Sequence, residues 1–330
     1  MNICLIGGSG FIGTRLFNRF NSVDQSNSII IDKISSSTFP HSTSVGDIRH
    51  IDDLRRLIPE HSVIINLAAE HRDDVRPLSL YDDVNVGGAK NICLVAREKK
   101  VKTIIFTSSV AVYGFAPIGT DESGTIAPFN DYGRTKYEAE LIFKDWQQEE
   151  PNERTLVIIR PTVVFGEKNR GNVFNLLRQI ASGKFVMVGN GRNRKSMAYV
   201  ENVAAFIEYS VKFKPGIHIY NYIDKPDFTM NNLVANVNQI LSKPAKIGFR
   251  LPFTIGYMIG KCFDLMARLT GKRFAISSIR VKKFCANSVY NSAIDQSGFV
   301  PPVSLEKALE NTVRYEFIES HDRNNVFYTE

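Results

Sequence analysis

The stretch NICLIGGSGFIG, Asn2–Gly13, decides the fold of this chain of 330 residues. It begins with the apolar run ICLI, which is typical of a buried strand. Gly7, Gly10 and Gly13 follow at GxxGxxG spacing, and the helical pattern Phe11–Phe20 comes next. Glycine permits a tight turn and a close backbone approach to a bound group, and a helix N-terminus offers free amides to phosphates. The stretch therefore predicts a strand–turn–helix unit that binds a dinucleotide.

Apolar runs alternate with amphipathic patterns through the first half of the chain. The runs that predict strands are Ile3–Ile6, Ser28–Asp32, Val63–Ala68, Thr103–Ser109 and Thr155–Pro161. Helical patterns between them are Phe11–Phe20, Asp83–Lys99 and Asp131–Gln148. Continuous apolar strands separated by helices indicate a parallel sheet covered on both faces. The expected fold class is α/β, a doubly wound parallel sheet.

After Gly166 the alternation weakens. Helical patterns there cover Asn172–Ala181, Glu201–Lys212, Met230–Leu241, Thr254–Leu269 and Leu305–Glu319, with one strand at His218–Tyr222. We expect a dinucleotide-binding domain over 1–166 and a smaller C-terminal substrate lobe over 167–330. Elements at about 196–223 are expected to return to the first domain.

The charge of the chain is concentrated in one window. The net charge is +7, yet residues 243–283 hold ten bases against one acid, Asp264. These bases are Lys243, Lys246, Arg250, Lys261, Arg268, Lys272, Arg273, Arg280, Lys282 and Lys283. Such an excess indicates a negatively charged partner.

Composition excludes several other classes of protein. The four cysteines have no CxxC spacing and are expected to be free thiols, so no metal site is predicted. No basic leader precedes the first strand, and no apolar run approaches the roughly 20 residues that span a bilayer. We expect a chain that is neither secreted nor membrane-spanning. Aromatic interleaving of the kind that binds nucleic-acid strands is missing from the basic window, so nucleic acid is not an expected partner.

An acidic residue ends the second predicted strand. Asp32 lies 19 residues beyond Gly13, where a carboxylate accepts hydrogen bonds from a ribose and repels a 2′-phosphate. Lys33 follows it, with no neighbouring arginine. The pattern favours NAD over NADP.

A tyrosine and a lysine are spaced YxxxK in the stretch DYGRTKYEAE. Tyr132 and Lys136 would share one helix face. A neighbouring ammonium favours phenolate, which would lower the pKa of Tyr132 and make it a general base for a hydroxyl group. Ser109 ends the predicted strand Thr103–Ser109, where its hydroxyl would bind the same substrate oxygen.

Taken together, these motifs resemble the extended short-chain dehydrogenase/reductase superfamily, in its NAD-dependent sugar epimerase/dehydratase branch. The matching stretches, which extend over the whole chain, are GGSGFIG, GDI, NLAA, NVGGAKN, TSSVAVYG, YGRTK, RPTVVFG, SMAYVENVA and SGFVPPVSLEKALENTV. Members transfer a hydride from a carbinol carbon to NAD while tyrosine takes the hydroxyl proton. In epimerases the keto-sugar turns over and receives the hydride on its other face.

The resemblance implies roles for particular residues. The catalytic set would be Ser109, Tyr132 and Lys136. The cofactor-binding set would be Gly7, Gly10, Phe11, Ile12, Gly13, Asp32, Lys33, Asp47, Ile48, Leu67, Ala68, Ala69, Asn85, Thr107, Tyr132, Lys136 and Pro161. The substrate-binding set would be His71, Ser109, Val110, Asn172, Lys195 and Arg280.

Two departures from family patterns narrow the reaction. Dehydratases carry an acidic pair where this chain has Val110 and Ala111, which leaves epimerisation or simple oxidoreduction. Nucleotide-sugar epimerases commonly carry an arginine where this chain has Lys195, and a lysine is a point charge rather than a bidentate fork.

His71 lies in the sequence EHRDD, for which two interpretations are open. His71 contacts the substrate, or the segment is a loop held by ion pairs among Arg72, Asp73 and Asp74.

The stretch Pro252–Arg273 predicts an amphipathic helix with basic flanks. Its apolar face would hold Ile255, Met258, Ile259, Cys262, Met266 and Leu269, with Lys261, Asp264 and Arg268 opposite. This pattern is typical of a helix lying on an anionic membrane surface. Packing of the same face on the core of the lobe is the alternative.

Long stretches further resemble a group of bacterial 4-epimerases that act on N-acetylglucosamine linked through diphosphate to undecaprenol, membrane-associated enzymes that feed O-antigen synthesis in lipopolysaccharide. These include LAAEHRDDVRPLSLY and CFDLMARLTGKRFAISSIRVKKFCA. The resemblance implies a cytoplasmic enzyme that is peripheral on the inner face of the plasma membrane. It is also compatible with a homodimer. A soluble 4-epimerase of UDP-N-acetylglucosamine or UDP-glucose, and a non-catalytic NAD-sensing regulator, are the alternatives.

Overall fold

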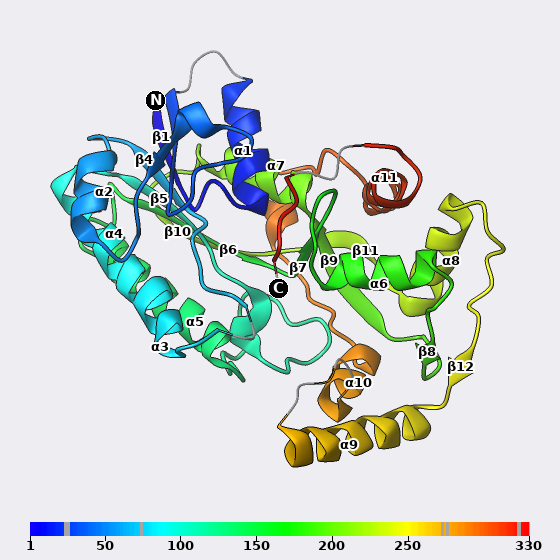
Figure 1. Cartoon of the computed structure of the whole chain (residues 1–330). Helices are drawn as coiled ribbons and strands as arrows, with labels where there is room; N and C mark the ends of the chain where they lie inside the picture. The colour runs from blue at the N-terminus through cyan, green and yellow to red at the C-terminus, as the bar shows by residue number, and fades with distance from the viewer. Residues whose placement is uncertain (23–26, 73–74, 272–273, 275–276, 322–324, 330) are drawn as a thin grey trace.

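A seven-stranded parallel sheet forms the larger part of the molecule (Figure 1). The structure is a computed structural model that describes residues 1–22, 27–72, 75–271, 274, 277–321 and 325–329. The strand order is β10-β6-β5-β4-β1-β2-β3. The strands are β1 (Asn2–Ile6), β2 (Asn27–Asp32), β3 (Thr43–Val45), β4 (Val63–Asn66), β5 (Thr103–Thr107), β6 (Thr155–Pro161) and β10 (Gly216–Tyr222).

Helices cover both faces of this sheet because successive strand residues are apolar. Ile3 and Leu5 pack in one cluster with α1 (Phe11–Asn21) and α7 (Val200–Ser210). Cys4 and Ile6 point to the other face, into a second cluster. That face is covered by α2 (Ile51–Leu57), α4 (Gly88–Glu98) and α5 (Asp131–Gln148). The predicted doubly wound α/β fold is confirmed.

Smaller sheets and the remaining long helices build the second part of the molecule. One sheet has the order β11-β9-β7, from β11 (Asp224–Thr229), β9 (Arg194–Tyr199) and β7 (Val163–Phe165). The other pairs β8 (Met187–Val188) with β12 (Arg250–Leu251). A third apolar cluster joins α6 (Asn172–Ala181), α8 (Met230–Ile240) and α11 (Leu305–Phe317) to the three-stranded sheet. The domain boundary at Gly166 stays a prediction.

Helices α9 (Phe253–Thr270) and α10 (Ser278–Cys285) form a hairpin at the edge of the molecule, in the orange part of Figure 1. Only Gly256 and Gly260 of α9 are buried. A Cβ at Gly260 would lie 2.7 Å from the backbone of Ser278, so glycine allows the two helices to approach closely. Lys272 and Arg273, part of the predicted basic window, lie outside the described residues. In the described part of the chain, no helix combines the length and apolarity needed to cross a membrane.

Short elements complete the chain and explain where the predicted boundaries were wrong. They are η1 (Pro40–Ser42), α3 (Ser79–Tyr81), the π-helix η2 (Asp82–Gly87), η3 (Val110–Tyr113) and η4 (Ile294–Ser297). Strand β3 was not predicted, because three residues are too few for a periodic signal. The predicted helix Asp83–Lys99 is a π-helical segment followed by α4.

Candidate active site

The glycine turn after β1 is built for close backbone approach. Gly7 has a φ of +77°, and a Cβ there would lie 2.5 Å from the amide nitrogen of Ala68. A Cβ at Gly13 would lie 2.5 Å from the Cα of Gly8. Helix α1 begins after Gly10, and no side chain of the described residues caps its first turn. The first turn, which includes Phe11 and Ile12, therefore offers amide groups beside a glycine cradle, which fits a dinucleotide pyrophosphate.

Asp32 ends β2 beside this turn. Its Oδ2 accepts a hydrogen bond from the amide of Ser9 at 3.0 Å, and its Oδ1 accepts one from the amide of Ile34 at 3.2 Å. Burial raises the pKa of Asp32, while these two amides oppose the shift. The carboxylate is thus held at the mouth of the glycine turn, and neighbouring Lys33 is exposed. This arrangement fits an adenosine ribose.

Asp47 and Ile48, which the resemblance places in the cofactor-binding set beside the adenine, follow β3. The carboxylate of Asp47 pairs with Arg49 at 2.6 Å, and this hydrogen bond holds the pKa of Asp47 below its usual range. Ile48 is buried in the core, and the Nδ2 of Asn91 donates to its carbonyl oxygen at 3.0 Å.

Other predicted cofactor residues lie where neighbouring strands end. Leu67, Ala68 and Ala69 follow β4, and Pro161 is the buried last residue of β6. Thr107 ends β5, and its hydroxyl donates to the carbonyl of Asn66 at 3.0 Å. Since parallel strands end at one edge of the sheet, these residues share the edge that holds the glycine turn.

Asn85 has a scaffolding contact that the sequence did not suggest. Its Oδ1 accepts from the amide of Glu70 at 2.9 Å, and its Nδ2 donates to the carbonyl of Glu70 and to Thr135 Oγ1. The side chain of Asn85 therefore ties the loop after β4 to helix α5.

Helix α5 presents the predicted catalytic pair. Asn130 caps the helix by accepting from the amide of Gly133 at 2.9 Å, which places Tyr132 in the first turn. Ser109 lies two residues beyond the end of β5 rather than inside it, because the chain turns there into η3. Its Oγ accepts from the amide of Ala111 at 3.1 Å, and the Ser109 side chain acts to lower the pKa of Tyr132.

The predicted lowering of the Tyr132 pKa by Lys136 is wrong in this structure. Burial raises the pKa of Tyr132, and the hydrogen bond with Ser109 opposes that rise. Lys136 is only 2% exposed, with its Nζ 4.3 Å from the centre of the Phe106 ring, and burial lowers its pKa to about 7. A lysine that burial pushes toward neutrality is a weak electrostatic partner, so Ser109 is the group that favours phenolate here.

A buried ion pair that was not predicted from the sequence supports this group of residues. Glu140 lies one turn beyond Lys136 and pairs with Arg160 of β6 at 2.6 Å, with both side chains at most 2% exposed. The Oγ of Ser108 donates to Glu140 at 2.6 Å. Arg160 also donates to the hydroxyl of Tyr113 at 2.6 Å. A signal was present: an acid four residues after Lys136, and an arginine inside the apolar run TLVIIRP.

The predicted substrate residues come from both parts of the chain: His71, Ser109 and Val110 lie before residue 166, and Asn172, Lys195 and Arg280 lie after it. Lys195 donates through Nζ to the carbonyl of Lys283 at 2.8 Å, and burial lowers its pKa to about 8. Arg280 of α10, Asn172 of α6 and His71 are exposed, and Val110 begins η3 beside Ser109. His71 Nδ1 lies 3.4 Å from the carbonyl of Ala69. Asp73 and Asp74, the proposed loop partners of Arg72, lie outside the described residues.

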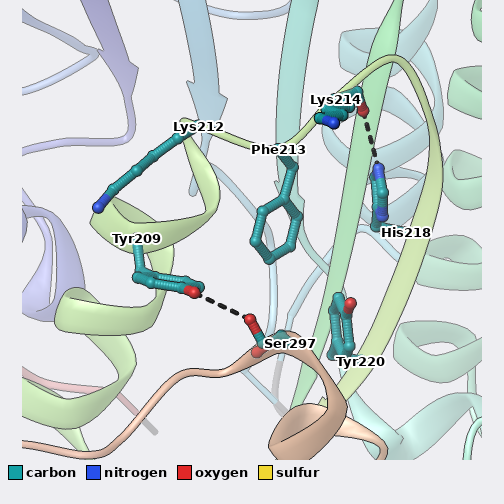
Figure 2. A pocket seen from close by; sticks show the side chains of 7 residues that line it. All are labelled: Tyr209, Lys212, Phe213, Lys214, His218, Tyr220 and Ser297. Atoms are coloured by element: carbon teal, nitrogen blue, oxygen red, sulfur yellow. Dashed lines mark hydrogen bonds between the residues drawn. The ribbon is translucent and has the colours of Figure 1, made fainter.

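Two further features lie outside this constellation. A pocket lined by aromatic and lysine side chains, shown in Figure 2, includes Tyr209, Phe213 and His218, and none of its residues belongs to the predicted sites. Within the described residues no group of three His, Cys, Asp or Glu side chains could hold a metal ion, and the four cysteines are free.

A doubly wound sheet with a glycine turn, an acidic second-strand end and a Ser–Tyr–Lys set defines a dinucleotide-dependent enzyme of the short-chain dehydrogenase/reductase class. The chain belongs to the NAD dependent epimerase/dehydratase family, whose model matches residues 3–221. NAD is therefore confirmed as the cofactor class, and the turn and Asp32 described above fit it.

Two curated proteins illustrate the similarity. The chain is 47% identical, over 100% of its length and 99% of the relative, to the N-acetyl-alpha-D-glucosaminyl-diphospho-ditrans,octacis-undecaprenol 4-epimerase of Escherichia coli O157:H7. It is 27% identical to the UDP-glucose 4-epimerase of Vibrio cholerae, over 98% of this chain and 97% of that one. Among solved structures, the UDP-glucose 4-epimerase of Thermotoga maritima shares the fold, with a TM-score of 0.74, 21% identity, and coverage of 96% and 98%.

Proposed function

We propose that this enzyme is a 4-epimerase that interconverts the N-acetylglucosamine and N-acetylgalactosamine forms of a sugar linked through diphosphate to undecaprenol. The observation that supports this most strongly is the 47% identity, end to end, with a relative whose name gives that substrate. The relative named for a nucleotide sugar is far less similar, at 27%. An exposed apolar helix in the lobe, described below, gives independent support.

In this proposal Tyr132 accepts the proton of the sugar O4 hydroxyl, and Ser109 donates a hydrogen bond to the same oxygen. NAD, when bound, takes up and returns the hydride at C4. Because the amide of Ala111 occupies a lone pair of Ser109, the Ser109 hydroxyl hydrogen is directed away as a donor. Lys136 would bind the nicotinamide ribose. Its burial against Phe106 fixes its direction before any ligand binds.

The proposed cofactor contacts use the first turn of α1 for the pyrophosphate and Asp32 for the adenosine ribose. Lys33, Asp47 and Ile48 would border the adenine, and the residues at the strand ends, including Thr107 and Pro161, would line the path to the nicotinamide. The geometry that supports these assignments is the shared sheet edge on which all of them lie.

For the substrate, Lys195 and Arg280 are proposed diphosphate contacts, with His71, Val110 and Asn172 nearer the sugar. The partial burial of Lys195 supports its role, because a partly desolvated cation binds an anion more strongly than an exposed one.

We also propose that α9 lies on an anionic membrane surface. Most of its large apolar side chains are exposed to solvent; they are Phe253, Ile255, Met258, Ile259, Leu265, Met266 and Leu269. Met258 is 67% exposed and Leu269 is 77% exposed, values that core packing does not produce. The flanking bases match an anionic leaflet. This location would place the enzyme at the cytoplasmic face of the inner membrane.

One residue of α9 differs from the helical-wheel prediction. Asp264, expected on the solvated polar face, accepts hydrogen bonds from the amide and hydroxyl of Ser278 at the start of α10. The single acid of the basic window therefore holds the hairpin together. The outer face of α9 keeps Lys261 and Arg268 exposed beside its apolar stripe.

A direct assay tests the proposed function. Purified enzyme with NAD is incubated with N-acetylglucosaminyl-diphospho-undecaprenol in detergent, and in parallel with UDP-N-acetylglucosamine, and the released sugars are analysed. Much faster formation of N-acetylgalactosamine from the lipid-linked donor supports the proposal. Faster conversion of UDP-N-acetylglucosamine supports the soluble nucleotide-sugar epimerase, and no conversion of any sugar donor supports the NAD-sensing regulator.

A further inference from the structure

An aromatic pair on the loop between η3 and α5 is unexplained by the assignments above. Phe115 is 64% exposed and Phe129 is 46% exposed, and their ring centres lie 4.9 Å apart. They occupy the two ends of the loop that leads from Ser109 to Tyr132. Two large apolar side chains that pack on each other in solvent, beside predicted catalytic residues, suggest an apolar ligand group.

The loop holds this pair in a fixed place. The amide of Ala127 donates to the carbonyl of Val112 at 3.0 Å, which folds the loop back on η3. Ala116 and Ile126, each near one member of the pair, pack inward on a cluster that contains Tyr113. The outward position of Phe115 and Phe129 is therefore set by the fold of the loop.

The pair is also joined to the proposed diphosphate contact. The Nζ of Lys283 lies 4.5 Å from the centre of the Phe129 ring, and the carbonyl of the same Lys283 accepts from Lys195 Nζ at 2.8 Å. The backbone of Lys283 therefore contacts the half-buried Lys195, while its exposed ammonium lies over one ring of the aromatic pair. This order, cation and then aromatic pair, matches the order of groups in a polyprenyl diphosphate, in which the charged diphosphate is followed by isoprene units.

We infer that Phe115, Phe129 and Lys283 form a subsite for the diphosphate–isoprenoid junction of the substrate. Lys283 binds the diphosphate, and the two rings cover the isoprene units nearest to it. The inference rests on the proposed function and adds to it a site that recognises the isoprenoid part of the substrate. In this account the loop before Tyr132 binds the isoprenoid, whereas α9 binds the membrane surface.

A series of soluble substrates tests this subsite without a membrane. The substrates are N-acetylglucosaminyl diphosphate esters of ethanol, geraniol and farnesol, kept below their micelle concentrations. For the unmodified enzyme, kcat/KM should rise roughly tenfold or more from the ethyl to the farnesyl ester, because an apolar chain is buried. The double variant Phe115→Ser/Phe129→Ser should lose that rise and keep its activity on the ethyl ester.

Controls separate this subsite from the other proposals. Val300→Ser alters an apolar residue that is 80% exposed elsewhere, and Leu269→Ser alters the outer face of α9; both should keep the full chain-length effect. Lys283→Met should raise KM for all three esters alike. Equal kcat/KM for the three esters in the unmodified enzyme would overturn the subsite and leave the epimerase proposal intact. Failure to convert any ester would overturn both.

Discussion

Tyr132 is the residue on which the proposed chemistry depends. Tyr132 lies in the first turn of α5, and the side chain of Ser109 acts to lower its pKa. Tyr132→Phe removes only the hydroxyl, so turnover should fall by about a hundredfold or more, as expected when a general base is removed. NAD binding, measured by the quenching of protein fluorescence, should persist because the glycine turn is unchanged. Tyr137→Phe, one turn further along the same helix, is the matched control, and retained turnover in Tyr132→Phe would contradict the role.

Ser109 should set the pH dependence of the reaction. The hydrogen bond from Ser109 opposes the burial that raises the pKa of Tyr132, so it stabilises the phenolate form. Removing this bond in Ser109→Ala raises the pKa of Tyr132 further. The rising limb of the kcat/KM–pH profile, which reports the free enzyme, should therefore move to higher pH. A profile that keeps its position while its height falls would mean that Ser109 binds substrate without tuning Tyr132.

Lys136 shows why residue roles are only partly readable from a sequence. The YxxxK spacing predicted which residues come together, and both lie in the same part of α5. Whether the pKa of Tyr132 is raised or lowered depends mainly on burial, and burial is a property of the packed fold. The position of Lys136 over Phe106 involves a residue 30 positions away, which spacing within one helix does not predict.

At the scale of elements, the Glu140–Arg160 pair joins the parts of the chain that hold the candidate site. It links α5, which bears Lys136, to β6, which ends in Pro161, and Ser108 connects it to the segment that bears Ser109. Glu140→Gln leaves Arg160 charged and buried, which should lower the free energy of unfolding by about 3–5 kcal/mol. Urea denaturation measures this loss.

The control for this prediction is an exposed ion pair. Arg55 and Glu98 lie 2.9 Å apart with both side chains more than 40% exposed. Because water screens exposed charges, Glu98→Gln should lower the free energy of unfolding far less than Glu140→Gln does. Similar losses in the two variants would show that the buried pair has no special structural role.

Most elements follow from local patterns, and the exceptions have physical reasons. The strand Thr155–Pro161 and the helices Asn172–Ala181 and Asp131–Gln148 match their predicted bounds, because apolar periodicity extends to their ends. The predicted strands Val63–Ala68 and Thr103–Ser109 each extend two residues beyond the observed strands β4 and β5. The residues after each strand are still apolar or small because they line the sheet edge where a ligand is expected, so the sequence pattern does not mark the strand end.

At the scale of the whole molecule, the exposed apolar stripe of α9 is the feature that supports the proposed membrane association. The α9 stripe was predicted from periodicity, but its exposure depends on a glycine contact and on Asp264, neither of which the helical wheel identified. Phe115 and Phe129 have no periodic pattern at all, so their pairing required the structure.

The exposed stripe predicts membrane binding that depends on both charge and apolar area. The protein should cosediment with vesicles that contain phosphatidylglycerol, and less so as salt is raised. Met258→Ser/Leu269→Ser should weaken this binding by about tenfold or more, because two exposed apolar side chains are lost. Val300→Ser should bind as the parent does. Unchanged sedimentation of the double variant, or a change only in its oligomeric state, would assign the stripe to a protein contact instead.

The most direct test of the central claim follows the hydrogen at C4 of the sugar. N-acetylglucosaminyl-diphospho-undecaprenol that carries deuterium at C4 is incubated with the enzyme and NAD in ordinary water, and the N-acetylgalactosamine formed is analysed by mass spectrometry. If Tyr132 moves only the O4 proton while the C4 hydride leaves and returns within one site, the product retains deuterium at C4. Loss of that deuterium to solvent, or absence of N-acetylgalactosamine, would contradict the account.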